Sequence, residues 1–228
     1  MNQVTHVFFD LDHTLWDYDR SSKETLLEIY EQFGVSGFSV PEKKFINTFY
    51  TVNDGLWHRY NIGEIDRDYI KQNRFKTIFE RLNVDPSIAG EASKYFLNNC
   101  SSKPYLMPDA LTALNYLAPK YDLHIITNGF LDAQTNKIKN SGIDKYFSTM
   151  ATSECANSRK PSKEIFEYAL TKASASREGS IMIGDNPKTD ISGAREFGLK
   201  TILYDPSQKR RSLADFSISS LYELLKLL

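Results

Sequence analysis

Five short apolar segments constrain the fold of this chain more than any other feature of its sequence. They lie at residues 4–9, 123–127, 148–151, 180–183 and 200–204, and the third is the weakest. A compact apolar run of this length is typical of a strand that is buried on both faces of a parallel sheet. Segments with helical spacing of apolar residues lie between most of them. This alternation predicts a doubly wound α/β domain with a parallel, Rossmann-like sheet.

Four helical segments alternate with these strands and carry suitable signals at their ends. They are predicted at residues 110–118, 134–141, 162–172 and 188–197. Pro119 follows the first segment and Gly142 the second, and each is a residue type that commonly ends a helix. The last segment begins after Asn186-Pro187 and ends at Gly198, which favours a helix between them.

One long interruption separates the first strand from the second. Residues 18–102 carry apolar side chains at helical spacing, as in Phe45, Phe49 and Val52, and no strand-like run. Ser21 and Glu24 are spaced as a capping box, which predicts a helix that begins there. We therefore expect residues 1–17 and 103–228 to form the α/β core domain, and residues 18–102 to form an inserted helical cap domain.

Composition and charge exclude several classes of protein. The chain has 228 residues, of which 41% are hydrophobic and 25% charged, and its formal charge is −1, so no basic field favours nucleic acid. Cys100 and Cys155 suggest no disulfide framework, and we expect neither a leader nor a membrane-spanning segment. We expect a cytoplasmic protein, a monomer or a homodimer, without a membrane or nucleic-acid partner.

The first strand ends in two carboxylates. Asp10 and Asp12 follow the apolar residues 7–9, and alternate side chains of an extended segment share a face, so the two acids project together. Two anions at the end of a buried strand repel each other and lose hydration. A cation, a proton or a reactive role must therefore balance them. Thr14 adds a hydroxyl group two residues further on.

Polar residues also follow the other predicted strands. They are Thr127, Asn128 and Gly129 after the second, Lys160 after the third, and Asp185 and Asp190 after the fourth. Reactive groups in open α/β sheets gather at the carboxyl ends of the strands, so these side chains are expected to converge. Carboxylate oxygens suit a hard divalent ion such as Mg²⁺, and a lysine with backbone amides suits phosphate oxygens.

These segments, in this order, resemble the haloacid dehalogenase-like (HAD) hydrolase superfamily. The matching motifs are Asp-Leu-Asp-His-Thr at 10–14, Ile-Thr-Asn-Gly at 126–129, Lys-Pro at 160–161, and Gly-Asp at 184–185 with Asp190. The helical insert directly after the first motif resembles the type 1 cap of that superfamily. His13 stands where glycine is most common, and Arg159 lies in a loop that departs from the usual pattern of the family.

The resemblance implies a role for each matching residue. Asp10 would attack phosphorus to form an aspartyl-phosphate, and Asp12 would act as general acid and then as general base. Lys160 would neutralise phosphate charge and restrain the nucleophile. The phosphate group would be bound by Thr14, Thr127, Asn128, Gly129 and Lys160. Mg²⁺ would be held by the Asp10 carboxylate, the Asp12 carbonyl oxygen and Asp185, with Asp190 in support.

Further segments resemble the pyrimidine 5′-nucleotidase branch of the same superfamily. They are residues 125–130, Gln134 and residues 141–143 in the core, and Asn53, Trp57, Tyr60 and residues 63–65 in the insert. This resemblance implies a phosphomonoesterase whose substrate is a small phosphorylated metabolite, a nucleoside monophosphate, with Asn53 and Trp57 as substrate contacts in the cap.

Other functions fit part of the pattern. Another small-metabolite phosphatase, acting on a sugar phosphate or on phosphoglycolate, or a phosphomutase would use the same catalytic residues. A 2-haloacid dehalogenase shares the aspartate nucleophile but needs neither a metal nor an acid at position 12, so Asp12 and Asp185 count against it. A phospho-acceptor receiver domain has no helical insert after its first strand.

Overall fold

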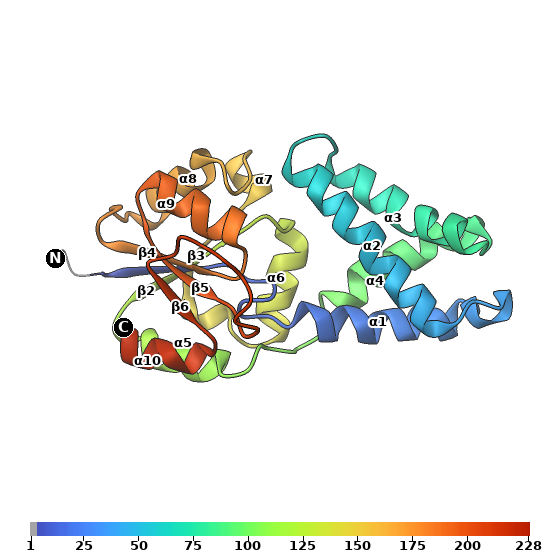
Figure 1. Ribbon diagram of the computed structural model, residues 1–228, viewed down its shortest axis with the longest axis horizontal. Helices are drawn as coiled ribbons and strands as arrows, with labels where there is room; N and C mark the ends of the chain where they lie inside the picture. The colour runs from blue at the N-terminus through green and yellow to red at the C-terminus, as the bar shows by residue number, and fades with distance from the viewer. Residues whose placement is uncertain (1–3) are drawn as a thin grey trace. The chain divides into compact units, whose positions relative to one another are not determined.

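The structure is a computed structural model that describes residues 4–228 (Figure 1). The chain divides into two compact units. The first contains the residues up to Tyr18 together with Pro104–Leu228, and the second is Asp19–Lys103. The second unit is thus an insertion in the chain of the first, and each unit is described separately below.

A parallel sheet forms the centre of the first unit. In residues 4–228 it has six strands, which are β1 (His6–Phe9), β2 (Asp122–Thr127), β3 (Phe147–Thr152), β4 (Ser180–Gly184), β5 (Lys200–Tyr204) and β6 (Phe216–Ile218). Their order across the sheet is β3-β2-β1-β4-β5-β6, and every neighbouring pair is parallel. The direction of strand addition reverses between β1 and β4, where such sheets place their ligands. The predicted α/β fold is confirmed.

Strand β1 is the central element of this sheet. Its residues Val7, Phe8 and Phe9 are completely buried. Phe9 pairs with Ile125 of β2 on one side and with Ile183 of β4 on the other. The Asp10 amide continues this ladder by donating to the Ile183 carbonyl at 2.9 Å. The backbone of Asp10 is therefore fixed by the sheet itself.

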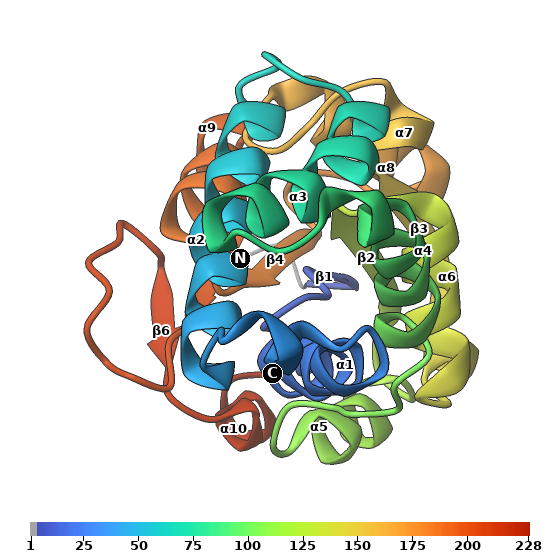
Figure 2. The ribbon, with the colours of Figure 1, turned by 90° about the vertical axis from the view of Figure 1, so that its right-hand side faces the viewer.

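Helices cover both faces of the sheet. The helices of this unit are α5 (Ala110–Leu117), α6 (Leu131–Asn140), α7 (Ser153–Ala156), α8 (Lys163–Ala173), α9 (Gly193–Phe197) and α10 (Leu224–Leu227). Figures 1 and 2 show α8 and α9 on one face and α5 and α10 on the other. Phe166 and Phe197 stack at 5.9 Å between ring centroids and join one buried cluster with Phe8 and Met182 of the sheet. This apolar packing holds the strand ends in place.

The region after β4 and the edge of the sheet differ most from the prediction for this unit. The predicted helix at 188–197 is a π-helical turn, Pro187–Ser192, followed by the short α9. The Asn186 side chain accepts from the amides of Lys188 and Thr189, and its carbonyl accepts from two later amides, which widens the turn. Strand β6 was not predicted, because this edge strand has three residues, two of them exposed, and lacks a buried apolar run.

The second unit is helical, as the sequence predicts. Its helices are α1 (Tyr18–Gln32), α2 (Glu42–Asn61), α3 (Arg67–Leu82) and α4 (Ala89–Cys100), with 3₁₀ turns at Val35–Phe38 and Pro86–Ile88. Buried phenylalanines fill its core, with Phe49 and Phe96 at 4.9 Å and Phe75 and Phe79 at 5.8 Å between ring centroids. No helix of residues 4–228 is long and apolar enough to cross a membrane.

The predicted capping box at Ser21 and Glu24 is wrong. Helix α1 already begins at Tyr18, so Ser21 lies inside it and is buried. The Ser21 carbonyl accepts from the Thr25 hydroxyl at 2.9 Å, and the Ser22 hydroxyl donates to the Asp19 carbonyl at 3.2 Å. The spacing was compatible with a cap, but Ser21 lies in the interior of α1 and therefore is not its N-cap.

A buried histidine in the sheet generates a prediction for stability. One His124 ring nitrogen lies 3.0 Å from His6 and the other 2.9 Å from the Thr149 hydroxyl, and the ring stacks on Phe8. Burial, with a smaller effect of His6, lowers the pKa of His124 to about 4. The unfolded chain, with an ordinary histidine pKa near 6.5, takes up this proton first as the pH falls.

We therefore expect the contribution of His124 to lower the free energy of unfolding by on the order of 1–2 kcal/mol as the pH falls from about 7 to about 5. His124→Gln removes the titration and keeps an amide that forms hydrogen bonds. Urea unfolding at the two pH values measures the effect. The wild type should lose more stability than the variant, and an equal loss in both would contradict the prediction.

Candidate active site

Side chains from four segments meet at the carboxyl edge of the sheet in the first unit. Asp10 follows β1, Lys160 lies before α8, Asp185 follows β4, and Asp190 lies in the π-helical turn. One carboxylate oxygen from each of the three aspartates lies within 4.8 Å of the others. Lys160 contacts two of these carboxylates. The structure therefore brings together residues that the sequence predicts as catalytic and metal-binding.

The Lys160 ammonium is the centre of this cluster. It lies 2.7 Å from Asp10 Oδ1, 2.7 Å from Asp190 Oδ1 and 2.8 Å from the Ile126 carbonyl oxygen, and the residue is 2% exposed. An ammonium group has three protons to donate, so these contacts use all of them. Lys160 thus binds Oδ1 of Asp10, whereas among residues 4–228 Oδ2 of Asp10 accepts only a long bond of 3.5 Å from the Thr14 hydroxyl.

The backbone of Lys160 is held by Asn128. The Asn128 amide nitrogen donates to the Lys160 carbonyl at 3.0 Å, and the Lys160 amide donates to the Asn128 side-chain oxygen at 2.8 Å. These two bonds join the loop after β2 to the loop before α8. The Asn128 side chain therefore fixes the position of Lys160. The predicted phosphate contact of residues 128–129 would then be made by their backbone amides, and it stays a prediction.

The cluster carries more negative than positive charge. Burial raises the pKa of Asp10 well above its ordinary value, Asp190 and Asp185 raise it further, and Lys160 opposes the shift. Burial and Asp190 also raise the pKa of Asp185. The pKa of Lys160 is raised as well, because the two carboxylates outweigh the effect of its burial. Three carboxylates thus share the lysine and Arg210, and the set of hard oxygen donors fits Mg²⁺.

Asp185 and Asp190 are themselves fixed by neighbouring groups. Arg210 contacts Asp185 Oδ2 at 2.8 Å and donates to its carbonyl. Asp190 accepts from the Asn186 amide at 3.0 Å in addition to Lys160. Position 184 must be glycine, because a Cβ atom there would lie 2.4 Å from Asp190 Oδ2. The end of β4 is therefore shaped to admit the Asp190 carboxylate.

Asp12 has separate partners on α6. Lys137 lies 2.6 and 2.9 Å from its two carboxylate oxygens, and the Gln134 amide donates to Oδ2 at 2.9 Å. Burial raises the pKa of Asp12, but Lys137 and the hydrogen bonds lower it by more, so it lies below the ordinary value. The Asp12 carboxylate therefore faces α6 and is no part of the acidic cluster, which agrees with the expectation that only its carbonyl oxygen binds the metal.

The Thr127 hydroxyl is oriented by two donors. It accepts from the Gly129 amide at 3.0 Å and from Gln134 Nε2 at 2.7 Å. A hydroxyl oxygen accepts two bonds, so its proton points elsewhere and remains a donor. A Cβ atom at position 129 would lie 1.8 Å from Gln134 Nε2, so glycine there lets Gln134 approach Thr127. Thr127 is thus prepared to donate to an acceptor such as a phosphoryl oxygen.

Sequence reasoning missed Lys137 and the direct contacts of Gln134. Helix α6 begins at Leu131 instead of the predicted residue 134, and both residues lie inside the predicted helix as well as the observed one. They are three positions apart and therefore share a face. Both are buried, together with Ile138. The sequence signal that could have revealed them is that Gln134 and Lys137 lie on the same helix face as the apolar Ile138, where a buried polar side chain needs a partner.

The predicted cap residues lie on α2 of the second unit. Asn53 is buried and accepts from Arg74 at 3.1 Å, and the Trp57 ring packs edge-on against Tyr60 at 5.4 Å. Their contact with a substrate stays a prediction. In the first unit, His13 has a φ angle of 63°, the left-handed conformation that glycine adopts most readily. The backbone at position 13 thus tolerates histidine where glycine is common.

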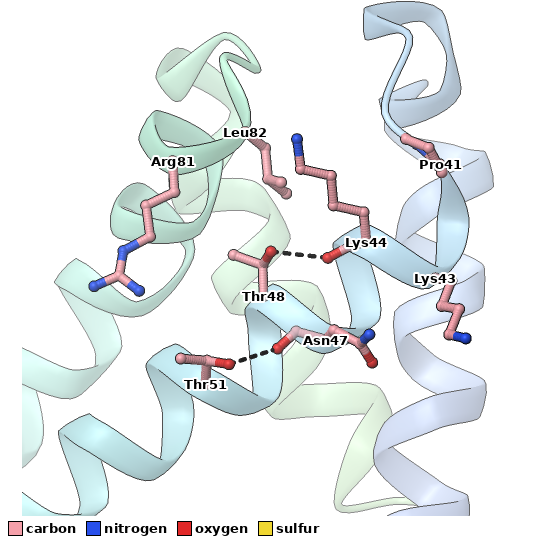
Figure 3. A pocket seen from close by; sticks show the side chains of 8 residues that line it. All are labelled: Pro41, Lys43, Lys44, Asn47, Thr48, Thr51, Arg81 and Leu82. Atoms are coloured by element: carbon pink, nitrogen blue, oxygen red, sulfur yellow. Dashed lines mark hydrogen bonds between the residues drawn. The ribbon is translucent and has the colours of Figure 1, made fainter.

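The second unit also has an open groove on α2 and α3, with a volume of about 510 Å³ (Figure 3). Its lining residues are Pro41, Lys43, Lys44, Asn47, Thr48, Thr51, Arg81 and Leu82. The hydroxyls of Thr48 and Thr51 donate to carbonyl groups one helical turn earlier, as Figure 3 shows. Neither Asn53 nor Trp57 lines this groove, so it is not the predicted substrate contact.

A parallel sheet of this order, with an acidic cluster around a buried lysine at its carboxyl edge, defines a hydrolase of the HAD type. The family model for haloacid dehalogenase-like hydrolases matches residues 7–204. The chain therefore belongs to this family and is an enzyme of it, as the sequence motifs predict.

Individual relatives support the same assignment. The chain is 31% identical to pyrimidine 5′-nucleotidase YjjG of Escherichia coli, over 97% of this chain and 96% of that protein. It is 28% identical to pyrimidine 5′-nucleotidase PynA of Streptococcus pneumoniae, over 88% and 83% of the two chains. The crystal structure of HAD-hydrolase YfnB from Bacillus subtilis bound to magnesium matches with a TM-score of 0.88 and 25% identity, over 100% and 99% of the chains.

The acidic cluster generates a prediction for metal binding. Mg²⁺ should raise the melting temperature of the wild type, because a ligand at about a hundred times its Kd stabilises the native state by about 2.7 kcal/mol. Asp185→Asn removes one carboxylate, so its shift should be much smaller. Asp144→Asn, at an exposed position of the same unit, is the matched control and should keep the full shift. An equal shift in wild type and Asp185→Asn would rule out this site.

Proposed function

We propose that this protein is a Mg²⁺-dependent phosphomonoesterase that forms an aspartyl-phosphate on Asp10 and hydrolyses pyrimidine nucleoside 5′-monophosphates. The observation that carries the proposal is the Lys160 ammonium, which binds Oδ1 of Asp10, whereas Oδ2 has a long contact with Thr14 as its one hydrogen bond within the described part of the chain. One oxygen of a buried carboxylate is thus restrained while the other is positioned to attack. This is the arrangement that a carboxylate nucleophile requires.

In the first step, Asp10 Oδ2 would attack phosphorus, and the bond from phosphorus to the ester oxygen would break. The departing alkoxide takes a proton from the Asp12 carboxyl group. Asp12 must be protonated for this, and the dianionic phosphate beside it favours the protonated form. The Thr127 hydroxyl donates to a phosphoryl oxygen, and Lys160 offsets the charge of the group in transfer.

In the second step, Asp12 would act as a base. Its carboxylate takes a proton from a water molecule that attacks phosphorus. The bond between phosphorus and Asp10 breaks, so the Asp10 carboxylate is restored and inorganic phosphate leaves. Asp12 has then regained the proton that the first step consumed. When bound by Asp10, Asp185 and Asp190 with the Asp12 carbonyl, Mg²⁺ would offset the negative charge that phosphate brings to the carboxylates.

The substrate class rests on the relatives. YjjG and PynA are both named pyrimidine 5′-nucleotidases, and each aligns with more than four fifths of this chain. A ribulose-1,5-bisphosphate 5-phosphatase of Halopiger xanaduensis also aligns, at 27% identity. The relatives together therefore support the broader substrate class of small phosphorylated metabolites. A cytoplasmic location is part of the proposal, and the monomer or homodimer stays a prediction.

A 2-haloacid dehalogenase is the alternative within the same fold. Such an enzyme uses an aspartate nucleophile but needs neither a general acid nor a metal. The paired Asp12 and Lys137, and the cluster of Asp10, Asp185 and Asp190, are features that it does not require. They favour the phosphomonoesterase.

Removing the nucleophile tests the mechanism. Asp10→Asn should reduce Mg²⁺-dependent release of phosphate from p-nitrophenyl phosphate by at least about 10⁴-fold, since an amide oxygen is a poor nucleophile. Asp17→Asn, a nearby position outside the cluster, is the control and should keep its activity. A variant Asp10→Asn that retains turnover would exclude Asp10 as the nucleophile.

A substrate panel tests the specificity. We expect kcat/KM for UMP, dUMP and TMP to exceed that for purine monophosphates and for sugar phosphates by at least about tenfold, which corresponds to 1.4 kcal/mol of transition-state binding. Phosphate release at fixed Mg²⁺ gives the values. A flat profile, or a preference for a sugar phosphate, would reject the nucleotidase assignment and keep the phosphatase.

A further inference from the structure

We infer that Gln134 and Lys137 of α6 are positioning residues, which hold the Asp12 carboxylate in the place from which it exchanges a proton with the leaving group. The inference rests on the proposed function, because it assigns a task to residues that contact the general acid. It extends that function from the motif residues to a helix that carries none of the four motifs.

The Lys137 ammonium fixes the orientation of the Asp12 carboxylate by contacting both of its oxygens. The ammonium lies 2.6 Å from Oδ1 and 2.9 Å from Oδ2, so it spans both oxygens. The Lys137 side chain is 9% exposed. Its ammonium also lies 4.6 Å from the centroid of the Trp16 ring, which is completely buried. A lysine held between a carboxylate and an aromatic face has little rotational freedom, so it restrains its partner.

Gln134 links the proton carrier to the phosphate-binding threonine. Its amide nitrogen donates to Asp12 Oδ2 at 2.9 Å and to the Thr127 hydroxyl at 2.7 Å, and the residue is completely buried. The two protons of one amide group thus fix the distance between Asp12 and Thr127. A phosphate ester bound to Thr127 would place its bridging oxygen at a defined position relative to Asp12.

The two residues act from one rigid element. They are three positions apart on α6, and each contacts Asp12 through a side chain that packing holds in place. Asp12 itself lies in the loop after β1, where its side chain would otherwise be free to rotate. Catalytic groups supported in this way keep the geometry that proton transfer needs, and a misplacement of about 1 Å costs about a hundredfold in rate.

The test compares two esters that differ in their need for the general acid. An alkoxide leaving group, as in UMP, needs a proton from Asp12, whereas p-nitrophenolate departs without one. The constant kcat/KM reports the steps through departure of the leaving group. Loss of the Asp12 position should therefore lower kcat/KM for UMP much more than for p-nitrophenyl phosphate, whereas a general loss of structure lowers both.

Lys137→Met should lower kcat/KM for UMP by about a hundredfold and for p-nitrophenyl phosphate by less than about tenfold. Lys137→Arg should restore most of the UMP value, since a guanidinium group also pairs with both oxygens of a carboxylate. Gln134→Leu removes a bond to Thr127 as well as the bond to Asp12, so it should lower both values, but that for UMP by at least about tenfold more. It tests the inference without a change of charge if Lys137→Met does not fold. Lys139→Met, at an exposed position of the same helix, is the control and should behave as wild type.

Equal losses on the two esters, or the same loss in Lys139→Met, would overturn the inference. A failure of the proposed function looks different: a wild type that hydrolyses neither ester is no phosphomonoesterase, and one that hydrolyses only p-nitrophenyl phosphate rejects the nucleotidase assignment. With an active wild type, equal losses reject only the positioning role of Gln134 and Lys137.

Discussion

The contact of the Lys160 ammonium with Asp10 and Asp190 is the interaction on which the rest of the site depends. It joins the end of β1 to the turn after β4, and its third bond reaches the Ile126 carbonyl in β2. A buried ion pair is weak support for stability by itself, but loss of one partner leaves buried charges uncompensated. The lysine therefore ties the geometry of three strand ends to the electrostatic balance of the site.

That balance is incomplete within the chain. Lys160 and Arg210 face three carboxylates, and burial with mutual repulsion raises the pKa of Asp10 and of Asp185. A cation at the cluster relieves this repulsion, and a phosphate group adds negative charge that makes the cation more necessary. The same charges that surround Asp10 therefore favour the binding of a cation such as Mg²⁺ at the cluster.

The sequence predicts the local elements well and the long-range contacts poorly. Strands β1, β2, β4 and β5 were predicted because buried parallel strands are compact apolar runs, and Asp10, Lys160 and Asp185 because they follow such strands. The π-helical turn was missed because Asn186 sets it through side-chain bonds, and β6 because an exposed edge strand has no apolar run. The contact of Lys137 with Asp12 joins residues 125 positions apart, which no local pattern encodes.

The separation of Asp10 from Asp12 is the last step from fold to chemistry. Both side chains leave the same strand end, yet burial and neighbouring carboxylates raise the pKa of Asp10, whereas Lys137 and Gln134 outweigh burial and lower that of Asp12. Environments that shift the pKa values of two carboxyl groups in opposite directions permit two different roles for these groups. Loops at the carboxyl edge of the sheet supply the partners of Asp10, and helix α6 supplies those of Asp12. Asp10 and Asp12, with one residue between them, can therefore have the separate proposed roles of nucleophile and proton carrier because their partners come from different elements of the fold.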